Sequence, residues 1–246
     1  MGTFYNSNIV TDGLVLCLDA ANPRSYPKSG TIWNDLSGNN NHGTLVNGPT
    51  FSSSNGGSIV FDGSNDSVNI SLNTSISVSS SASSSSLYQW TVMAFYKSNN
   101  ILTDINSSNP RHTIFAFNDS TFTNNGWYYL DLELWNDSYV FFNGNGTSSP
   151  QGAYVDSSRG SNNTGSFNLA TLTINGNTIS VYHNNALFRS TRNSTASMSS
   201  QYIKLGHRGI DNLLSGSIAA FYVYNQVLSS SEIIQNFNAT RGRYGI

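Results

Sequence analysis

The chain has 246 residues, of which 37% are hydrophobic, 12% aromatic and only 10% charged, and its formal net charge is −2. Abundant aromatic residues and a small net charge exclude an intrinsically disordered chain, and the shortage of Lys and Arg excludes a basic surface for nucleic acid. No apolar run reaches the length of about 18 residues that a membrane span needs, so we expect no membrane insertion. Ser, Asn, Thr and Gly replace the charged residues, which favours short strands joined by polar turns.

In chain order, the polar residues 1–12 predict an N-terminal arm or a first edge strand, and residues 13–246 predict one domain. A buried strand is expected at 13–19, and it holds the single cysteine, Cys17, as a buried and unreactive thiol. An Asn- and Gly-rich loop is expected at 33–43, because these residue types tolerate the left-handed backbone of a tightly folded loop.

Apolar or alternating runs predict the remaining strands. These are at 58–62, 67–72, 90–96, 112–117, 126–135, 139–143, 167–174, 178–183, 186–189, 202–206 and 216–224. The sequence Asn175-Gly176-Asn177 separates two of these runs and predicts a hairpin. The stretches 78–86 and 144–166 are rich in Ser, Gly or Asn and are interpreted as loops.

One helix is expected near the C-terminus, at about residues 230–238. Ser229 is followed three residues later by Glu232, the spacing of a capping box in which each side chain bonds the other residue's backbone N–H. Leu228 and Ile233 flank this pair as a hydrophobic staple. No change in composition divides the chain, so strands and helix are expected to share one domain.

Three segments together resemble the laminin G-like (concanavalin A-like) family. They are 13–23 with 33–45 behind it, 59–68 with its Phe-Asp-Gly turn, and 205–233, in which a Gly-Ile strand passes into a short Leu-Ser-x-x-Glu-Ile helix. The resemblance implies an all-β fold, a two-sheet antiparallel jelly-roll sandwich with one short C-terminal helix.

The opening and the tail at 236–245 resemble, more narrowly, single-domain proteins encoded by tailed bacteriophages. In that group such domains occur as decorations, fibres or tail appendages of the virion. The N-terminus has neither the basic region nor the apolar region of a secretory signal, which agrees with a virion location. The first hypothesis is therefore a non-enzymatic structural component of a virion, whose partners are other virion proteins or copies of itself.

A second hypothesis comes from the strand at 126–135. Tyr129, Asp131, Glu133 and Trp135 alternate with leucines and share one face of it. Aromatic rings stack on sugars and carboxylates accept hydroxyl protons, so this face is a candidate glycan site of an adhesin that recognises host surface polysaccharide. The alternatives are that the acidic pair faces solvent, or that residues 144–166 or another subunit cover the face.

Enzymatic activity is not expected. A glycosidase places two carboxylic acids across a groove, and Glu133 and Glu232 are the only glutamates of the chain. Glu232 is explained by the helix cap, and the chain lacks both glutamates of the Glu-x-Asp-x-x-Glu strand motif of the β-jelly-roll glucanases. A polysaccharide depolymerase is the least favoured hypothesis.

Calcium is the one cofactor with candidate ligands. Members of the laminin G-like family often hold a Ca²⁺ ion at the rim of the sandwich, through acidic side chains and backbone carbonyls. Asp62 and Asp66 flank the predicted turn and Asp35 lies in the Asn-rich loop, so these three are the candidate ligands. Asp is equally an ordinary turn residue, and that alternative stays open.

Overall fold

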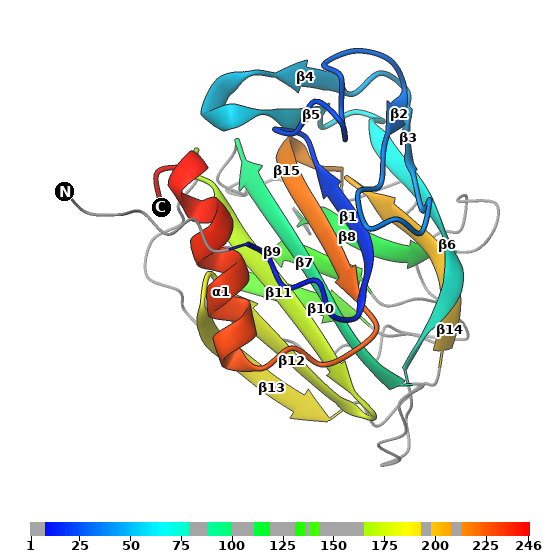
Figure 1. Cartoon of the computed structure of the whole chain (residues 1–246), viewed down its shortest axis with the longest axis vertical. Coiled ribbons are helices and arrows are strands. Elements are labelled where there is room, and N and C mark those ends of the chain that lie inside the picture. Colours follow the sequence, from blue (N-terminus) through cyan, green and yellow to red (C-terminus); the bar gives the residue numbers. More distant parts are fainter. Residues whose placement is uncertain are drawn as a thin grey trace.

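The computed structural model describes residues 8–78, 88–99, 111–118, 131–135, 138–142, 165–192, 198–207 and 213–246. Within these residues the strands form two antiparallel sheets that pack face to face, and one helix, α1 (Ser230–Thr240), covers the outer face of the first sheet (Figure 1). The fold class expected from the sequence, an all-β two-sheet sandwich with a short C-terminal helix, is confirmed.

The described strands of the first sheet follow the order β13-β12-β11-β7-β15-β5-β4, with β1 paired to β15 beside β5. Their bounds are β1 (Leu14–Asp19), β4 (Thr50–Ser52), β5 (Ser58–Asp62), β7 (Gln89–Ser98), β11 (Asn168–Asn175), β12 (Thr178–His183), β13 (Ala186–Arg192) and β15 (Ser215–Tyr224). The long β7 and β15 lie at the centre of this sheet and form its most extensive pairing (Figure 1).

The described strands of the second sheet follow the order β10-β9-β8-β14-β6-β3-β2. Their bounds are β2 (Ile32–Trp33), β3 (Gly43–Val46), β6 (Ser67–Val78), β8 (Arg111–Asn118), β9 (Asp131–Trp135), β10 (Ser138–Phe142) and β14 (Met198–Leu205). Two single-turn 3₁₀ helices, η1 (Ser54–Gly56) and η3 (Arg241–Arg243), complete the described elements.

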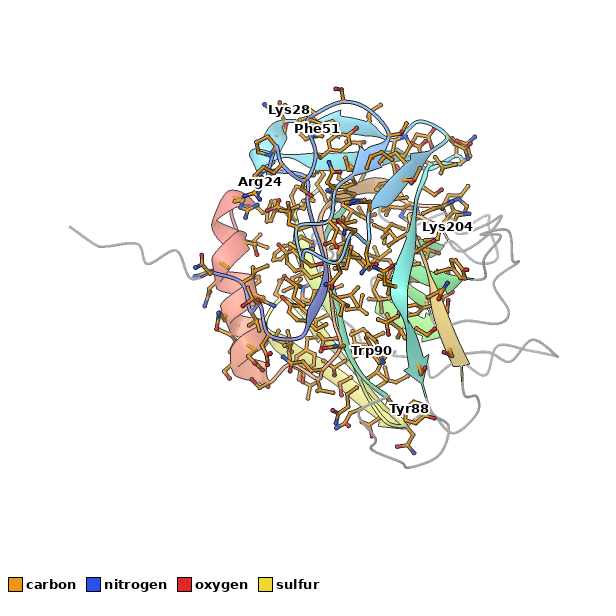
Figure 2. All side chains as sticks on the ribbon, turned by 45° about the vertical axis from the view of Figure 1, so that its right-hand side comes forward. Arg24, Lys28, Phe51, Tyr88, Trp90 and Lys204 are labelled. Atoms are coloured by element: carbon orange, nitrogen blue, oxygen red, sulfur yellow. The ribbon has the colours of Figure 1, made fainter. Side chains whose placement is uncertain are left out.

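The main core lies between the two sheets. Alternating residues of each strand point into it, as the period of two of a β-strand requires, and their side chains fill the space between the layers (Figure 2). Phe115 of the second sheet and Phe221 of the first meet edge to face with ring centroids 5.6 Å apart. Both are fully buried, and each such side chain contributes about 1.5–3 kcal/mol through burial alone.

A second apolar cluster lies between the first sheet and α1. The capping box predicted at Ser229 and Glu232 is present, and Ile233 and Phe237 of the helix are buried against the sheet. Asn236 has no exposed surface and links three elements. Its amide donates to Tyr224 Oη at 3.0 Å, and its carbonyl accepts the Val10 N–H at 2.8 Å.

Residues 8–12 are held on the domain by side chains of α1 and the preceding turn. Gln235 donates to the Asn8 carbonyl at 2.8 Å, Gln226 donates to the Asp12 carbonyl at 3.0 Å, and Val10 is 8% exposed. The division into an arm at 1–12 and a domain at 13–246 stays a prediction, with residues 8–12 in contact with the helix.

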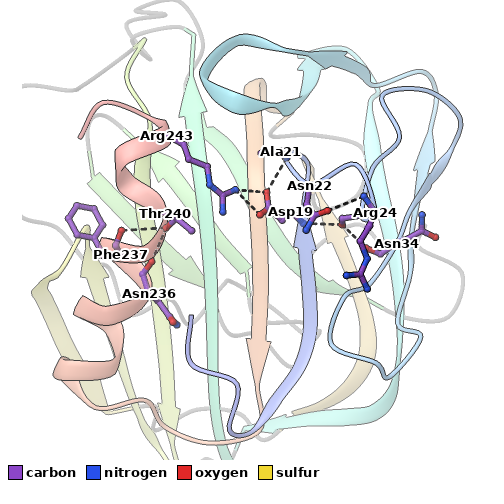
Figure 3. Close-up of polar contacts among 10 residues, drawn as sticks. Asp19, Ala21, Asn22, Arg24, Asn34, Asn236, Phe237, Thr240 and Arg243 are labelled. Atoms are coloured by element: carbon purple, nitrogen blue, oxygen red, sulfur yellow. Dashed lines mark hydrogen bonds and ion pairs between the residues drawn. The ribbon is translucent and has the colours of Figure 1, made fainter. Parts of the chain in front are cut away.

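A partly buried ion pair joins the C-terminal end to β1. Nη1 of Arg243 donates to both carboxylate oxygens of Asp19, at 2.9 and 2.7 Å (Figure 3). The Asp19 side chain is 10% exposed and also accepts the Ala21 N–H at 3.0 Å. Beside this pair, Tyr244 packs its ring on Phe95 with centroids 5.2 Å apart.

The sequence anticipated most described strands but not β2, β3 and β4, which are two to four residues long. The hairpin at Asn175-Gly176-Asn177 is confirmed, since Asn175 pairs with Thr178 and Gly176 takes a φ of 60° at the first position of the two-residue turn. The predicted loops 78–86 and 144–166 fall almost entirely outside the described residues. In the part of the chain that is described, no helix is long and apolar enough to cross a membrane.

Candidate functional site

The acidic pair of β9 is buried. Leu132 and Leu134 point into the main core, so Asp131 and Glu133 lie on the outer face of the second sheet, as the alternation predicted. Asp131 is only 2% exposed and Glu133 is fully buried, where it accepts a hydrogen bond from Thr113 Oγ1 at 2.9 Å. Of the alternatives, a solvent-facing acidic pair is therefore wrong. Alternation along a strand assigns a side chain to one face of the sheet, but it does not determine what packs over that face.

The two aromatic members of the predicted glycan site are not placed by the structure. Tyr129 lies outside the described residues, and for Trp135 the described part is its backbone in β9. A role for this face in glycan binding stays a prediction.

The outer face of the second sheet changes from accessible to buried between β3, near one edge, and β9, near the other. Strand pairing places Thr44 of β3 opposite Asn69 of β6, and Asn69 opposite Lys204 of β14. The same row continues through Ala116 of β8 to Asp131 of β9. Thr44 is exposed and Asn69 is half-buried, whereas Lys204, Ala116 and Asp131 are 2–6% exposed. The accessible part of this row is therefore at the β3–β6 edge.

Asp35 organises the loop that leads to this edge. Its Oδ1 accepts the N–H groups of Cys17 and Ser37, both at 2.8 Å. Its Oδ2 accepts the Ser37 hydroxyl at 2.7 Å and the Asn41 N–H at 3.0 Å. A carboxylate has about four lone-pair positions, and these four hydrogen bonds fill them. Asp35 therefore fits a structural anchor for backbone N–H groups and does not fit a calcium ligand.

The other two candidate calcium ligands share one turn. Asp66 Oδ2 accepts the Asp62 N–H at 3.0 Å, and Asp62 Oδ1 accepts the Ser64 N–H at 2.7 Å, which closes the turn after β5. Burial raises the pKa of Asp66, and the nearby charge of Asp62 adds to the effect. Among the described residues no group of three or more His, Cys, Asp or Glu side chains is arranged to hold a metal ion. The structure thus brings Asp62 and Asp66 together and leaves Asp35 in a separate loop.

Amide side chains fix the Asn-rich loop to its neighbours. Asn41 is 1% exposed, donates to the Val15 carbonyl at 2.7 Å and accepts the Asn73 N–H at 2.8 Å. Asn73 in turn donates to the Asn39 carbonyl at 2.6 Å. Asn40, between them, has a φ of 59°, the left-handed backbone that the composition of the loop predicted. These hydrogen bonds fix the loop to β1 and β6, in agreement with the tightly folded loop that its composition predicted.

An open polar hollow of about 460 Å³ lies where this loop meets the sheet edge. It is lined by Asn40, His42, Thr44, Asn69 and Ser71. Asn69 and Ser71 belong to β6 and Thr44 belongs to β3. All three point away from the core, because their neighbours along each strand, Val68, Ile70 and Leu45, point into it. We call this feature the edge hollow.

The ring of His42 has a defined tautomer in the edge hollow. The backbone N–H of Asp35 donates to His42 Nδ1 at 3.0 Å, so Nδ1 is unprotonated and the neutral ring carries its proton on Nε2. His42 thus offers one N–H donor, Asn40 and Asn69 offer amide donors and acceptors, and Thr44 and Ser71 offer hydroxyls. Among these five residues there is no Asp, Glu, Lys or Arg, and their hydrogen-bond donors and acceptors suit a polyhydroxylated ligand.

The sequence did not identify the edge hollow. Its loop was recognised as tightly folded, but the two β6 residues and the pairing of β3 with β6 had no local signal. A pattern of polar residues at 69, 71 and 73 against apolar 68, 70 and 72 marks an outward face, yet it does not say which loop lies beside it.

No protein-family profile matches the chain, and no curated protein does. Solved structures of similar fold do exist. The binding domain of botulinum neurotoxin DC in complex with rat synaptotagmin II has a TM-score of 0.66 and 16% identity over 94% of this chain. The botulinum neurotoxin type G receptor binding domain gives 0.65 and 14% over 92%. The neurotoxin DC domain in complex with SialylT gives 0.65 and 16% over 94%.

This chain spans about half the length of those structures, 51–52% in each case. The likeness is one of fold. At these identities the comparison shows a shared jelly-roll, concanavalin A-like β-sandwich fold and nothing about the ligand. The ligand of this chain has to be argued from its own residues.

Proposed function

We propose that this chain is a non-enzymatic recognition domain that binds a surface glycan, and that the edge hollow is where the glycan is held. The observation that carries the proposal is the hollow itself: five uncharged donors and acceptors converge on an open space supported by strands β3 and β6 and by a rigid loop. A site built on rigid elements loses little conformational entropy on binding. The shared fold supports the proposal, since one of the similar domains is in complex with SialylT.

The proposal of a non-enzymatic role rests on the placement of the acids. The five residues that line the hollow include no Asp or Glu, and Asp131 and Glu133 are buried on β9, toward the opposite edge of the same sheet. A retaining or inverting glycosidase needs two carboxyl groups facing its substrate. We expect purified chain to release no reducing sugar from polysaccharides. Release that disappears in Asp131→Asn and Glu133→Gln variants would identify a depolymerase instead.

The test of glycan binding is a titration of the isotopically labelled chain with surface polysaccharide fragments, followed by NMR. We expect saturable shifts of the His42 ring and Asn69 amide signals, with dissociation constants of about a millimolar for short sugars, because the hydrogen bonds replace bonds to water. Asn69→Ala should weaken binding several-fold. Asn238→Ala is the matched control, because Asn238 is exposed on α1, which covers the other sheet. Equal binding by both variants would refute the assignment.

A second candidate function is that of a structural component of a bacteriophage virion. The two candidates are compatible, because a decoration protein of the virion could also bind host glycan. The virion role is supported by the resemblance of the opening and of the tail at 236–245 to phage-encoded domains. In the structure, Arg243 and Tyr244 of that tail pack on the domain. Mass spectrometry of purified particles should detect the chain at a fixed copy number. Its absence from particles, while the isolated chain binds glycan, would leave the adhesin role alone.

A further inference from the structure

The loop between β2 and β3 is closed at its base by reciprocal hydrogen bonds. The backbone N–H of Asp35 donates to His42 Nδ1 at 3.0 Å, and Asp35 Oδ2 accepts the Asn41 N–H at 3.0 Å. This loop carries two of the residues that line the edge hollow, Asn40 and His42. The positions of these two side chains therefore depend on the closure of the loop.

The closure requires a neutral His42 ring. Because Nδ1 accepts the Asp35 N–H, it carries a lone pair, and the single ring proton lies on Nε2. A second proton can bind only at Nδ1, and in the resulting imidazolium both ring nitrogens are donors. Two N–H groups would then face each other across 3.0 Å. The N–H of Asp35, a residue that is only 9% exposed, would lose its acceptor, and the ring would leave its place in the hollow.

The carboxylate of Asp35 does not replace the lost bond. Asp35 is the only acid between residues 33 and 43, and its four lone-pair positions already accept hydrogen bonds from Cys17, Ser37 and Asn41. Its charge attracts an imidazolium but offers it no lone pair at which to bind. Since His42 is exposed, a charged ring that turns outward finds its acceptors in water.

The other elements around the hollow hold few titratable groups. Thr44 of β3 and Asn69 and Ser71 of β6 line it and carry no charge. Lys204 of β14 is paired opposite Asn69, and its positive charge disfavours a second cation nearby. Burial raises the pKa of Cys17 on β1 to about 12, so that thiol stays neutral. Among the described residues around the hollow, His42 is therefore the side chain able to change its charge between about pH 8 and pH 5.

We propose that the edge hollow is a pH-dependent site, which holds its glycan while the His42 ring is neutral and releases it when the ring takes up a proton. This inference rests on the proposed function and adds the regulation of the same site. The sign follows from the closure of the loop: the affinity is present at high pH, where the ring is neutral, and is lost as the pH falls through the range in which histidines are protonated. By linkage, a saccharide that accepts the Nε2–H favours the neutral ring in turn.

The experiment has two arms, both by NMR on the full chain between about pH 8 and pH 5. Without ligand, we expect the ring protons of His42 and the backbone amide of Asp35 to shift with one midpoint. With gluco-, manno- and galacto-oligosaccharides, which do not titrate in this range, the dissociation constant should rise about tenfold from the upper to the lower pH, because only the fraction with a neutral ring binds.

Two variants assign the effect. His42→Asn keeps an acceptor for the Asp35 N–H close to the position of Nδ1 and cannot be protonated. It should bind a few-fold more weakly at the upper pH, because it lacks the Nε2–H donor, and with equal affinity at the lower pH. His112→Gln is the matched control, because His112 lies on β8 away from the hollow, and it should keep the change of about tenfold. Circular dichroism of each chain at each pH checks that the fold is retained.

The outcomes separate the regulation from the proposed function. If a saccharide binds in the hollow with the same affinity at both ends of the pH range, glycan binding stands and its regulation by His42 is wrong. A pH dependence that persists in His42→Asn, or that disappears in His112→Gln, would also overturn the role of His42. An Asp35 amide that does not follow the His42 ring would overturn the loop closure as its cause. If no saccharide binds at any pH, the proposed function falls, and the amide titration alone decides whether the loop responds to pH.

Discussion

Replacing Asp35 with asparagine tests whether this carboxylate anchors the loop that supports the edge hollow. Each of its two oxygens accepts two hydrogen bonds in the structure, and three of these four bonds come from backbone N–H groups. An asparagine keeps one accepting oxygen and turns the other position into an NH₂ group. The Ser37 hydroxyl can rotate to accept from that group, but the Asn41 N–H, in a residue that is 1% exposed, cannot.

The magnitude follows from these contacts. Hydrogen bonds to a charged group contribute about 1.5–3 kcal/mol each, and a buried donor left without an acceptor costs about 1–3 kcal/mol. Allowing for relaxation of the loop, Asp35→Asn should lower the free energy of unfolding by about 3 kcal/mol. For a domain of this size that corresponds to a fall in Tm of about 6–12 °C.

The assay is urea unfolding followed by circular dichroism, with Asp62→Asn as the control. Asp62 is exposed and closes a different turn, so its variant should lose less than about 1 kcal/mol. EDTA should leave the Tm of the original chain unchanged. A loss below 0.5 kcal/mol in Asp35→Asn would refute the anchoring role. A fall in Tm with EDTA that Asp35→Asn abolishes would show that the residue binds calcium instead.

Three further predictions concern the interior. Burial lowers the pKa of His112 to about 4, so between about pH 6.5 and 4 the unfolded chain binds more protons than the folded chain. Acidification through that window should therefore remove up to about 3 kcal/mol of stability. In His112→Gln, the free energy of unfolding measured at about pH 6.5 and at about pH 4 should differ less than in the original chain. Burial raises the pKa of Cys17 to about 12, and the charges of Asp19 and Asp35 add to the effect. A thiol reagent at about pH 8 should therefore modify Cys17 only in denaturant, and rapid labelling of the native chain would contradict this. Arg243→Met leaves the Asp19 carboxylate without its ion-pair partner and should lower the free energy of unfolding in urea by about 1–2 kcal/mol. Arg243→Lys should be closer in stability to the original chain. Equal stability of all three chains would show that the ion pair contributes nothing.

The layers of the fold were predictable because their signals are local. Strands β5 and β12 have the bounds expected from their alternating residues, and the cap of α1 needs only Ser229 and Glu232, three positions apart. The hairpin between β11 and β12 is predicted by the Asn175-Gly176 dipeptide alone. By contrast, β2 and β4 are two or three residues long, too short for any period to be visible, and exist because they pair with β3 and β5.

The site was harder to predict because its contacts span long stretches of sequence. Asn41 bonds Val15 and Asn73, which are 26 and 32 residues away, and the edge hollow depends on how β3 is aligned with β6. The burial of Asp131 and Glu133 is of the same kind. Alternation assigns them to the outer face, but the environment on that face is set by tertiary packing, which no pattern within β9 encodes.

The most direct test of the account is to locate a bound saccharide by intermolecular nuclear Overhauser effects on the full chain. We expect contacts from the sugar to the Thr44 methyl group and to the ring protons of His42, both of which line the edge hollow. Contacts confined to α1 or to the first sheet, or a saccharide that binds with none of these protons near it, would contradict it.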